Sequence, residues 1–100
     1  MNYLISVKES IKDILSTPLG ARVMLPDYGS RLYELIDRKV DDEFRALLSW
    51  YVIEAVQKWE KRVSIEEVKL INFDGHSFAI SIILDDGQEL NIKVWDEFRK

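Results

Sequence analysis

The chain has 100 residues and a net charge of −4, with 47% hydrophobic and 32% charged residues and no cysteine. This length supports one hydrophobic core, so we expect a single domain over residues 1–100. An acidic chain is poorly suited to coating nucleic acid, and the lack of cysteine excludes disulfides, thiol catalysis and cysteine-bound metals. No apolar run approaches the ~20 residues of a membrane span. We therefore expect a globular domain that neither binds nucleic acid nor spans a membrane.

The N-terminal segment has helical spacing. Apolar residues at intervals of three and four predict a helix over residues 7–16. Ser6 and Glu9 have the spacing of a capping box at its start, and Thr17-Pro18 followed by Gly20 should end it. The next residues, 21–25, are expected to be extended.

Two further helices are expected before residue 62. Ser30 is a plausible N-cap for a short helix over residues 31–38. Asp41 is a plausible N-cap for a longer helix over residues 42–61, in which apolar residues recur at almost every third or fourth position. Acidic residues begin this third helix and basic residues end it, in agreement with the helix dipole.

The period changes from helical to alternating near Arg62. Glu66-Glu67 interrupts the alternation of the first strand and predicts a bulge. Asp86-Gly87 between two alternating runs predicts a hairpin with a type I′ turn. The expected fold class is α+β: three N-terminal helices, then a three-stranded antiparallel meander packed on the long third helix, with strands over residues 63–72, 77–84 and 88–95.

Catalytic chemistry has little support in this sequence. His76 is the only histidine and the four glycines are isolated, so neither a multi-histidine metal site nor a phosphate loop is expected. Paired carboxylates are the remaining option, and Asp27, Glu34 and Glu60 are the conceivable members of such a pair. A chain of this size has little room for a deep polysaccharide groove. We expect no enzyme activity, no metal and no cofactor.

Two segments look more specific than packing requires. Residues 17–30 read Thr-x-x-Gly-x-Arg-Val-Met-x-Pro-acid-aromatic-Gly-Ser, and residues 59–63 read Trp-Glu-Lys-Arg-Val. Together they resemble the baseplate wedge family of contractile phage tails, which includes tail protein W, the so-called tail lysozymes and the wedge subunit of type VI secretion. Ten residues carry the first motif: Thr17, Gly20, Arg22, Val23, Met24, Pro26, Asp27, Tyr28, Gly29 and Ser30.

The second family motif is Glu-Pro-Arg. Glu60 and Arg62 match it, whereas Lys61 stands where proline is usual. In the first motif Ala21 stands where an acid is common. Neither departure affects the expected fold.

The resemblance implies a structural protein in a multi-protein assembly. Its partners would be the sheath protein, other baseplate wedge proteins and proteins at the base of the tube. It would be located in the baseplate of a virion or phage-like particle assembled in the bacterial cytoplasm. Its sheet would offer the first sheath ring an edge for strand addition. A tail-associated lysozyme that hydrolyses peptidoglycan is the alternative, and a free-standing adaptor is a third possibility. Phage, domesticated tail and secretion machine all remain open.

The resemblance also assigns roles to residues. Glu60 and Arg62 are expected to dock sheath or wedge proteins. Replacing both by alanine is then expected to block sheath attachment or wedge assembly while changing the stability of the isolated domain by under about 1 kcal/mol. Without the resemblance, they would be a solvated helix end. Arg22 and Asp27 could pair with each other or cap helix ends. The first motif is expected to be mainly architectural, through Gly20, Arg22, Pro26, Asp27, Tyr28 and Gly29.

Overall fold

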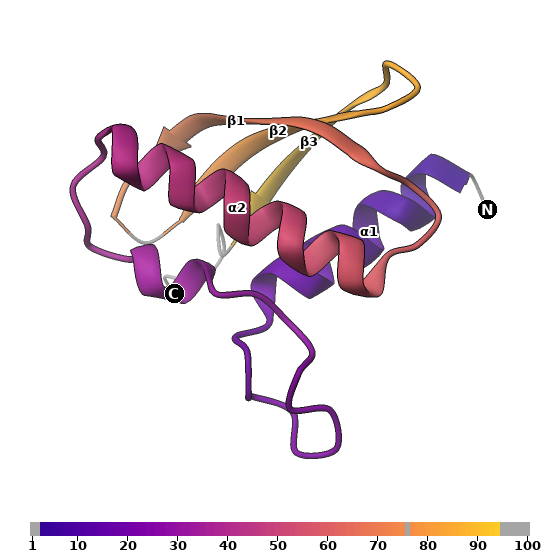
Figure 1. The fold of residues 1–100 in the computed structure, drawn as a ribbon, viewed down its shortest axis with the longest axis horizontal. Coiled ribbons are helices and arrows are strands. Elements are labelled where there is room, and N and C mark those ends of the chain that lie inside the picture. The colour runs from indigo at the N-terminus through magenta and orange to yellow at the C-terminus, as the bar shows by residue number, and fades with distance from the viewer. Residues whose placement is uncertain (1–2, 76, 95–100) are drawn as a thin grey trace.

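The computed structural model describes residues 3–75 and 77–94, and within them two α-helices precede a three-stranded antiparallel sheet. The helices form one layer and the sheet covers them as a second layer (Figure 1). In chain order the elements are α1 (Tyr3–Ser16), one turn of 3-10 helix η1 (Leu32–Leu35), α2 (Asp42–Trp59), β1 (Ile65–Phe73), β2 (Phe78–Leu84) and β3 (Glu89–Val94).

The expectation of three N-terminal helices with a long third helix is wrong. Residues 31–38 form only the single turn η1, so the long helix is the second α-helix of the described chain. Asp37 has a left-handed backbone, with φ +67°, which a right-handed helix cannot continue. Its N–H instead donates to the carbonyl of Gly75 at 3.0 Å. This helix therefore ends after a single turn, where Asp37 makes a tertiary contact with the segment between β1 and β2.

The cap predicted for α2 is confirmed, whereas the cap predicted for α1 is wrong. Asp41 caps α2 as predicted, because its Oδ1 accepts a hydrogen bond from the N–H of Phe44 at 2.9 Å. The capping box predicted at Ser6 is wrong, since α1 already begins at Tyr3. The hydroxyl of Ser6 instead accepts a hydrogen bond from Arg62 Nη1 at 3.3 Å.

The sheet has one regular and one irregular outer strand. The bulge predicted at Glu66-Glu67 is confirmed by a register shift between Ile65 and Glu67, and a second shift follows between Leu70 and Asn72. The pairing of β2 with β3 has no such shift. The two edges of the sheet are therefore different.

The hairpin at Asp86-Gly87 is confirmed, but its turn is not type I′. The N–H of Leu84 donates to the carbonyl of Gln88 at 2.8 Å, which leaves a three-residue loop between them. Gly87 is the residue of this loop with positive φ, at +91°, whereas a type I′ turn needs two in succession.

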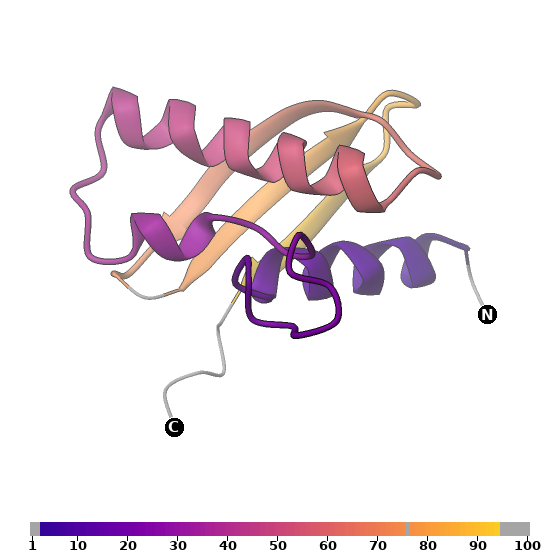
Figure 2. The ribbon, with the colours of Figure 1, turned by 60° about the horizontal axis from the view of Figure 1, so that its bottom comes forward.

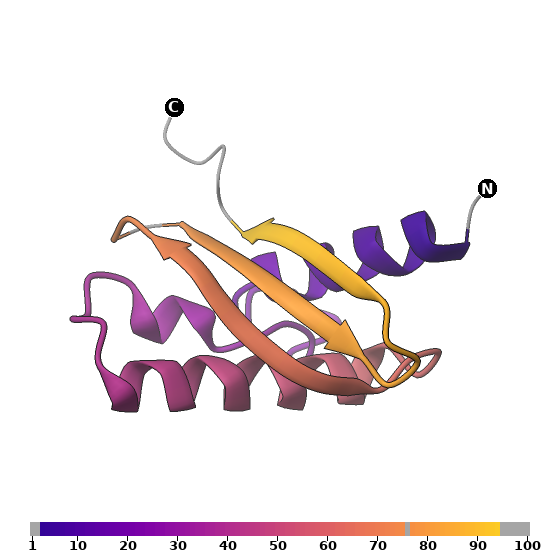
Figure 3. The same cartoon turned by 90° about the horizontal axis from the view of Figure 1, so that it is seen from above.

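The core lies between the helices and one face of the sheet. Helix α1 lies along β3 and α2 lies along β1, so the helices divide this face between them (Figure 2). No described element covers the other face (Figure 3). Every residue predicted for the core is buried, as alternation in the strands and i, i+3, i+4 spacing in the helices required. These residues are Leu15, Leu35, Phe44, Leu48, Tyr51, Val52, Ala55, Ile80, Ile82, Leu90 and Ile92.

Neither described α-helix is long and apolar enough to cross a membrane.

Candidate functional site

The loop of residues 17–30 projects from the helical layer, away from the sheet (Figures 1 and 2). Its base is closed by two backbone hydrogen bonds, from Ser30 N to Thr17 O at 2.9 Å and from Leu19 N to Ser30 O at 3.1 Å. Ser30 is buried, and its hydroxyl donates to the carbonyl of Leu15 at 2.9 Å while accepting from the N–H of Leu32 at 3.4 Å. The prediction that Ser30 caps a helix is wrong, because the N-cap of η1 is Arg31 and has no side-chain cap hydrogen bond; Ser30 instead fastens the loop to α1.

Gly29 is required where the two sides of the loop meet. Its φ of +116° is a region that L side chains rarely adopt. A Cβ built on Gly29 would lie 2.2 Å from the carbonyl oxygen of Thr17, which is backbone and cannot rotate away. Gly20 also has positive φ, at +90°, but a Cβ added there would enter open space, with no neighbouring atom within 4 Å. The two motif glycines thus serve different needs, steric closure at Gly29 and backbone conformation alone at Gly20.

Asp13, in the last turn of α1, holds the two sides of the loop. Its carboxylate accepts a hydrogen bond from the Tyr28 hydroxyl, and Arg22 Nη2 lies 3.3 Å from its Oδ2. The Arg22 guanidinium also stacks over the Tyr28 ring, 4.6 Å from its centroid. Burial, and then the hydrogen bond to Asp13, raise the pKa of Tyr28 to about 12, so the phenol remains a donor at neutral pH. The interpretation that Arg22 pairs with Asp27 is wrong.

Asp27 and Tyr28 connect the loop to the end of α2. The ring of Tyr28 meets Trp59 edge to face, with centroids 5.2 Å apart, and Trp59 Nε1 donates to the carbonyl of Asp27 at 3.2 Å. The Asp27 carboxylate lies 3.9 Å from Lys58 Nζ. Residues of the first motif therefore contact the beginning of the second motif directly.

Two consecutive turns form the tip of the loop and expose apolar side chains there. The N–H of Leu25 donates to Arg22 O, and the N–H of Tyr28 donates to Leu25 O, so residues 21–25 are a turn and not the expected extended segment. Pro26 occupies the second position of the later turn, where its fixed φ is favourable. Val23 and Met24 are 91% and 87% exposed. A rigidly held loop thus presents two apolar side chains to solvent.

Glu60 and Arg62 form a partly buried pair where α2 ends. Glu60 is 4% exposed, and its carboxylate accepts from Arg62 Nε at 2.8 Å, Arg62 Nη2 at 2.7 Å and the Arg62 N–H at 3.2 Å. Arg62 remains 43% exposed and also bonds Ser6 of α1. The expectation of a solvated pair is wrong, because only the arginine faces solvent.

The electrostatics of Glu60 follow from this pairing. The hydrogen bonds from Arg62 outweigh the opposing effect of burial, and a hydrogen bond from Ser10 adds to them, so the pKa of Glu60 falls from 4.5 to about 2. The group is therefore a stable anion at neutral pH. A general acid in glycoside hydrolysis needs the opposite shift, toward a raised pKa.

The candidate acids do not converge. Asp27 pairs with Lys58, Glu34 accepts from the Tyr51 hydroxyl at 3.1 Å, and Glu60 is enclosed by Arg62. No group of three or more histidines, cysteines or acids that could hold a metal occurs in the described residues, and His76 lies outside them.

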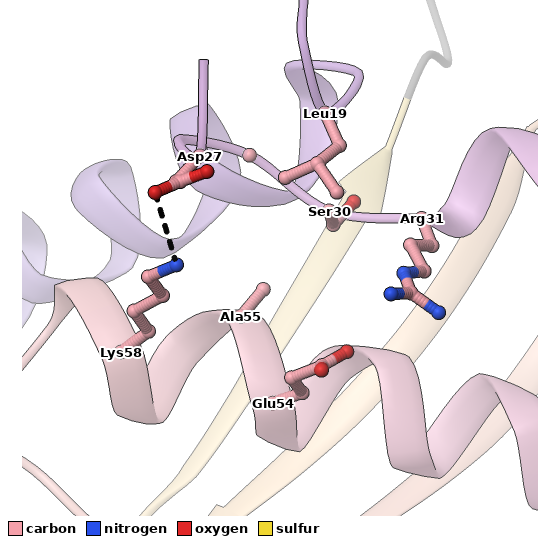
Figure 4. Close-up of a pocket in the computed structure, with 8 residues that line it drawn as sticks. Leu19, Asp27, Ser30, Arg31, Glu54, Ala55 and Lys58 are labelled. Atoms are coloured by element: carbon pink, nitrogen blue, oxygen red, sulfur yellow. Dashed lines mark ion pairs between the residues drawn. The ribbon is translucent and has the colours of Figure 1, made fainter. Parts of the chain in front are cut away.

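A pocket of about 220 Å³ separates the loop from α2, and Asp27 is the only one of the three candidate acids that lines it. Figure 4 shows Asp27 and Lys58 at one end and Arg31 and Glu54 at the other. The charged side chains that line this opening are thus two acids, Asp27 and Glu54, and two bases, Lys58 and Arg31.

Sequence reasoning missed the residues that support the motifs from outside them. Asp13, Ser6 and Ser10 belong to α1, and Lys58 belongs to α2. Asp13 sits four residues before Thr17, and the Thr17 hydroxyl donates to its carbonyl at 2.8 Å. Nothing in the local sequence distinguishes Asp13 from other surface acids, because its partners lie 9 and 15 residues away.

The chain is similar to known proteins in sequence and in fold. Baseplate protein W of Escherichia phage P2 is 36% identical over 94 residues, which cover 88% of this chain and 79% of that protein. The postcontracted baseplate of pyocin R2 contains a chain with a TM-score of 0.68 and 29% identity, covering 91% of this chain and 87% of that one. A protein described as a putative tail lysozyme from Geobacter sulfurreducens has a TM-score of 0.75 at 24% identity, covering 94% and 89%, and shares the fold.

The fold, the loop motif and these matches define a protein of the contractile-tail baseplate class. A family model described as baseplate wedge protein gp25 matches residues 2–93. The chain belongs to this family of baseplate wedge proteins.

The closure of the loop predicts a large difference between the two motif glycines. Gly29→Ala should lower the free energy of unfolding by more than about 3 kcal/mol, because it adds a backbone clash to an unfavourable φ. Gly20→Ala should cost about 1–2 kcal/mol, for the φ alone. Urea denaturation of the two variants measures the difference, and equal losses would contradict the steric role of Gly29.

The lowered pKa of Glu60 predicts a pH-dependent stability. A carboxyl with a pKa of about 2 in the fold and 4.5 in the unfolded chain stabilises the protein above pH 4.5 and loses this effect as the pH falls to about 2. The contribution at neutral pH is on the order of 3 kcal/mol. Glu60→Gln should therefore be less stable than wild type at pH 7, with the difference shrinking toward pH 2.

Urea unfolding at several pH values measures this effect, with the exposed Glu54→Gln as the matched control. The control should retain the wild-type slope between pH 4.5 and 2. A parallel slope for Glu60→Gln would show that Glu60 does not carry the effect.

Proposed function

We propose that this protein is a structural subunit of the baseplate wedge that docks other wedge proteins and templates the first ring of sheath by strand addition. The observation that carries the proposal is the open sheet. In the order β1-β2-β3, the outer strands β1 and β3 each have one side without a strand partner among the described residues. The relatives, a phage baseplate protein and a component of a pyocin baseplate, agree with this role.

An open strand edge is a chemically specific docking surface. Its outward N–H and C=O groups form hydrogen bonds to any extended segment that aligns with them, and the neighbouring side chains select which segment binds. The sheet rests on a continuous core formed by α1 and α2, so the edge is already ordered before a partner arrives. An ordered edge reduces the entropy lost on binding.

The junction between α2 and β1 is the proposed docking site for the wedge partner. The half-exposed guanidinium of Arg62 is held in place by Glu60 and Ser6, and Lys61 is exposed beside it. A preorganised arginine is well suited to bind a carboxylate or carbonyl on another subunit. The contact would strengthen once assembly excludes water.

Assembly experiments test this site without disturbing the buried pair. Lys61→Glu leaves Glu60 and Arg62 in place but reverses the adjoining charge, so it should reduce sheathed tails while leaving the melting temperature unchanged. Electron microscopy of assembled particles and thermal melting of the purified protein measure the two effects. Lys39→Glu, an equally exposed reversal elsewhere, is the control and should assemble normally.

The double variant Glu60→Ala with Arg62→Ala should fail in assembly and also melt earlier, because it removes the contacts to α1. Normal sheathed tails from both Lys61→Glu and the double variant would exclude this junction from docking.

We also propose that the protein does not hydrolyse peptidoglycan. The candidate acids Asp27, Glu34 and Glu60 each bind a different neighbour, and the lowered pKa of Glu60 disfavours the general-acid role.

Purified protein should therefore leave no clearing on a peptidoglycan zymogram beside an active lysozyme. Clearing by wild type that is lost in Glu34→Gln or Glu60→Gln, with folding retained, would establish the enzymatic alternative.

A further inference from the structure

The two edges of the sheet are unequal as templates for an incoming strand. β1 carries two register shifts within its nine residues, and bulges of this kind twist an edge and interrupt the spacing of its hydrogen-bonding groups. β3 pairs with β2 without a shift over its whole length. A straight, regular edge is therefore available at β3 and not at β1.

The register shows which groups β3 presents. Leu84 and Gln88 form a hydrogen-bonded pair next to the turn, from Leu84 N to Gln88 O. Antiparallel pairing alternates from there, so Leu90 and Ile92 bond back to β2. The backbone groups of Glu89, Asn91 and Lys93 consequently point away from the sheet, and no described backbone group outside the sheet bonds to them.

The side of the sheet next to this edge is hollow and basic. A pocket of about 440 Å³ is lined by Lys8 and Lys12 of α1 and by Asn91 and Lys93 of β3. Its floor includes the apolar residues Ile71 and Ala79, and none of its lining residues is acidic. Figure 3 shows α1 along the β3 side of the uncovered sheet.

The positive charge of this pocket is a local feature, since the chain as a whole has a net charge of −4. The acid of β3, Glu89, lies at the opposite end of the strand and accepts a hydrogen bond from Ser81. The three lysines therefore stand together at one end of the regular edge. A group of lysines such as this favours a partner that carries negatively charged side chains.

We propose that the incoming strand adds to the β3 edge and that it is an extended segment of the sheath protein with acidic side chains facing Lys8, Lys12 and Lys93. This inference rests on the strand-addition function proposed above and specifies its edge and its chemistry. The backbone of residues 89–93 supplies the hydrogen bonds, and the lysines fix which segment binds and in what direction.

The binding test uses the purified sheath protein from the same particle, immobilised at low ionic strength, with this chain in solution. Lys8→Glu combined with Lys93→Glu should weaken binding by about tenfold or more. Lys39→Glu combined with Arg45→Glu changes the net charge equally at exposed positions away from the sheet and should bind like wild type. Added salt should weaken wild-type binding more than that of the Lys8/Lys93 variant.

Asn91→Pro tests the edge separately from the charge. Its N–H points away from β2, so proline removes an outward donor without removing a bond of the sheet. We expect loss of sheath binding with a folded circular dichroism spectrum. If wild type binds and both Asn91→Pro and the charge reversal bind equally well, the β3 assignment is wrong while strand addition stands. If wild type itself does not bind, the strand-addition function fails, and this inference with it.

Carbodiimide cross-linking identifies the occupant directly. Mass spectrometry should find Lys8 or Lys93 joined to aspartate or glutamate within one short segment of the sheath protein. Cross-links from these lysines to a second copy of this chain, or to no carboxylate of the sheath protein, would overturn the proposal.

Discussion

Glu60 places a carboxylate where α1, α2 and the approach to β1 meet, and its charge is tolerated there because Arg62 and Ser10 of α1 donate hydrogen bonds to it. Removing one partner from such a pair leaves a buried charge without compensation, which is far more costly than losing a surface ion pair. The position of Arg62 relative to α1 depends on this carboxylate. An anion buried at a helix end, which the dipole disfavours, is thus explained by the tertiary structure.

The loop of residues 17–30 is ordered by contacts at its base and sides, and its exposed end makes none of them. Backbone bonds between Thr17 and Ser30 close the base, and Asp13 binds both Arg22 and Tyr28 from α1. Tyr28 then meets Trp59, so the loop is fixed to both helices. Arg22 and Tyr28 of the motif bond to other parts of the protein, whereas the apolar side chains of the tip, Val23, Met24 and to a smaller extent Leu25, are exposed to solvent.

The two faces of the sheet differ in what covers them (Figure 3). Its inner face, with residues such as Ile80 and Ile92, completes the core with the helices. Its outer face and its edges are left to other uses, and the bulges of β1 make that edge irregular. An antiparallel sheet that is buried on one face can leave its other face and its edges uncovered in this way.

Features that depend on neighbouring residues could be predicted from the amino-acid sequence alone. The period of apolar positions predicted that helices precede a three-stranded sheet and which residues form the core, although it predicted one helix too many. The position of Asp41 predicted the cap, and the motif of residues 17–30 indicated the family. Features that depend on distant residues emerge only in the folded chain. Asp37 bonds Gly75 and residues 31–38 make a single turn, and Arg22 pairs with Asp13 and not with nearby Asp27. Glu60 is buried and accepts hydrogen bonds from Arg62 and from Ser10 of α1. In each case a contact with a residue that is at least nine positions away, or on another element, overrides the local conformational preference of the chain. The spacing of residues in the sequence carries no information about where such a distant partner lies in the fold.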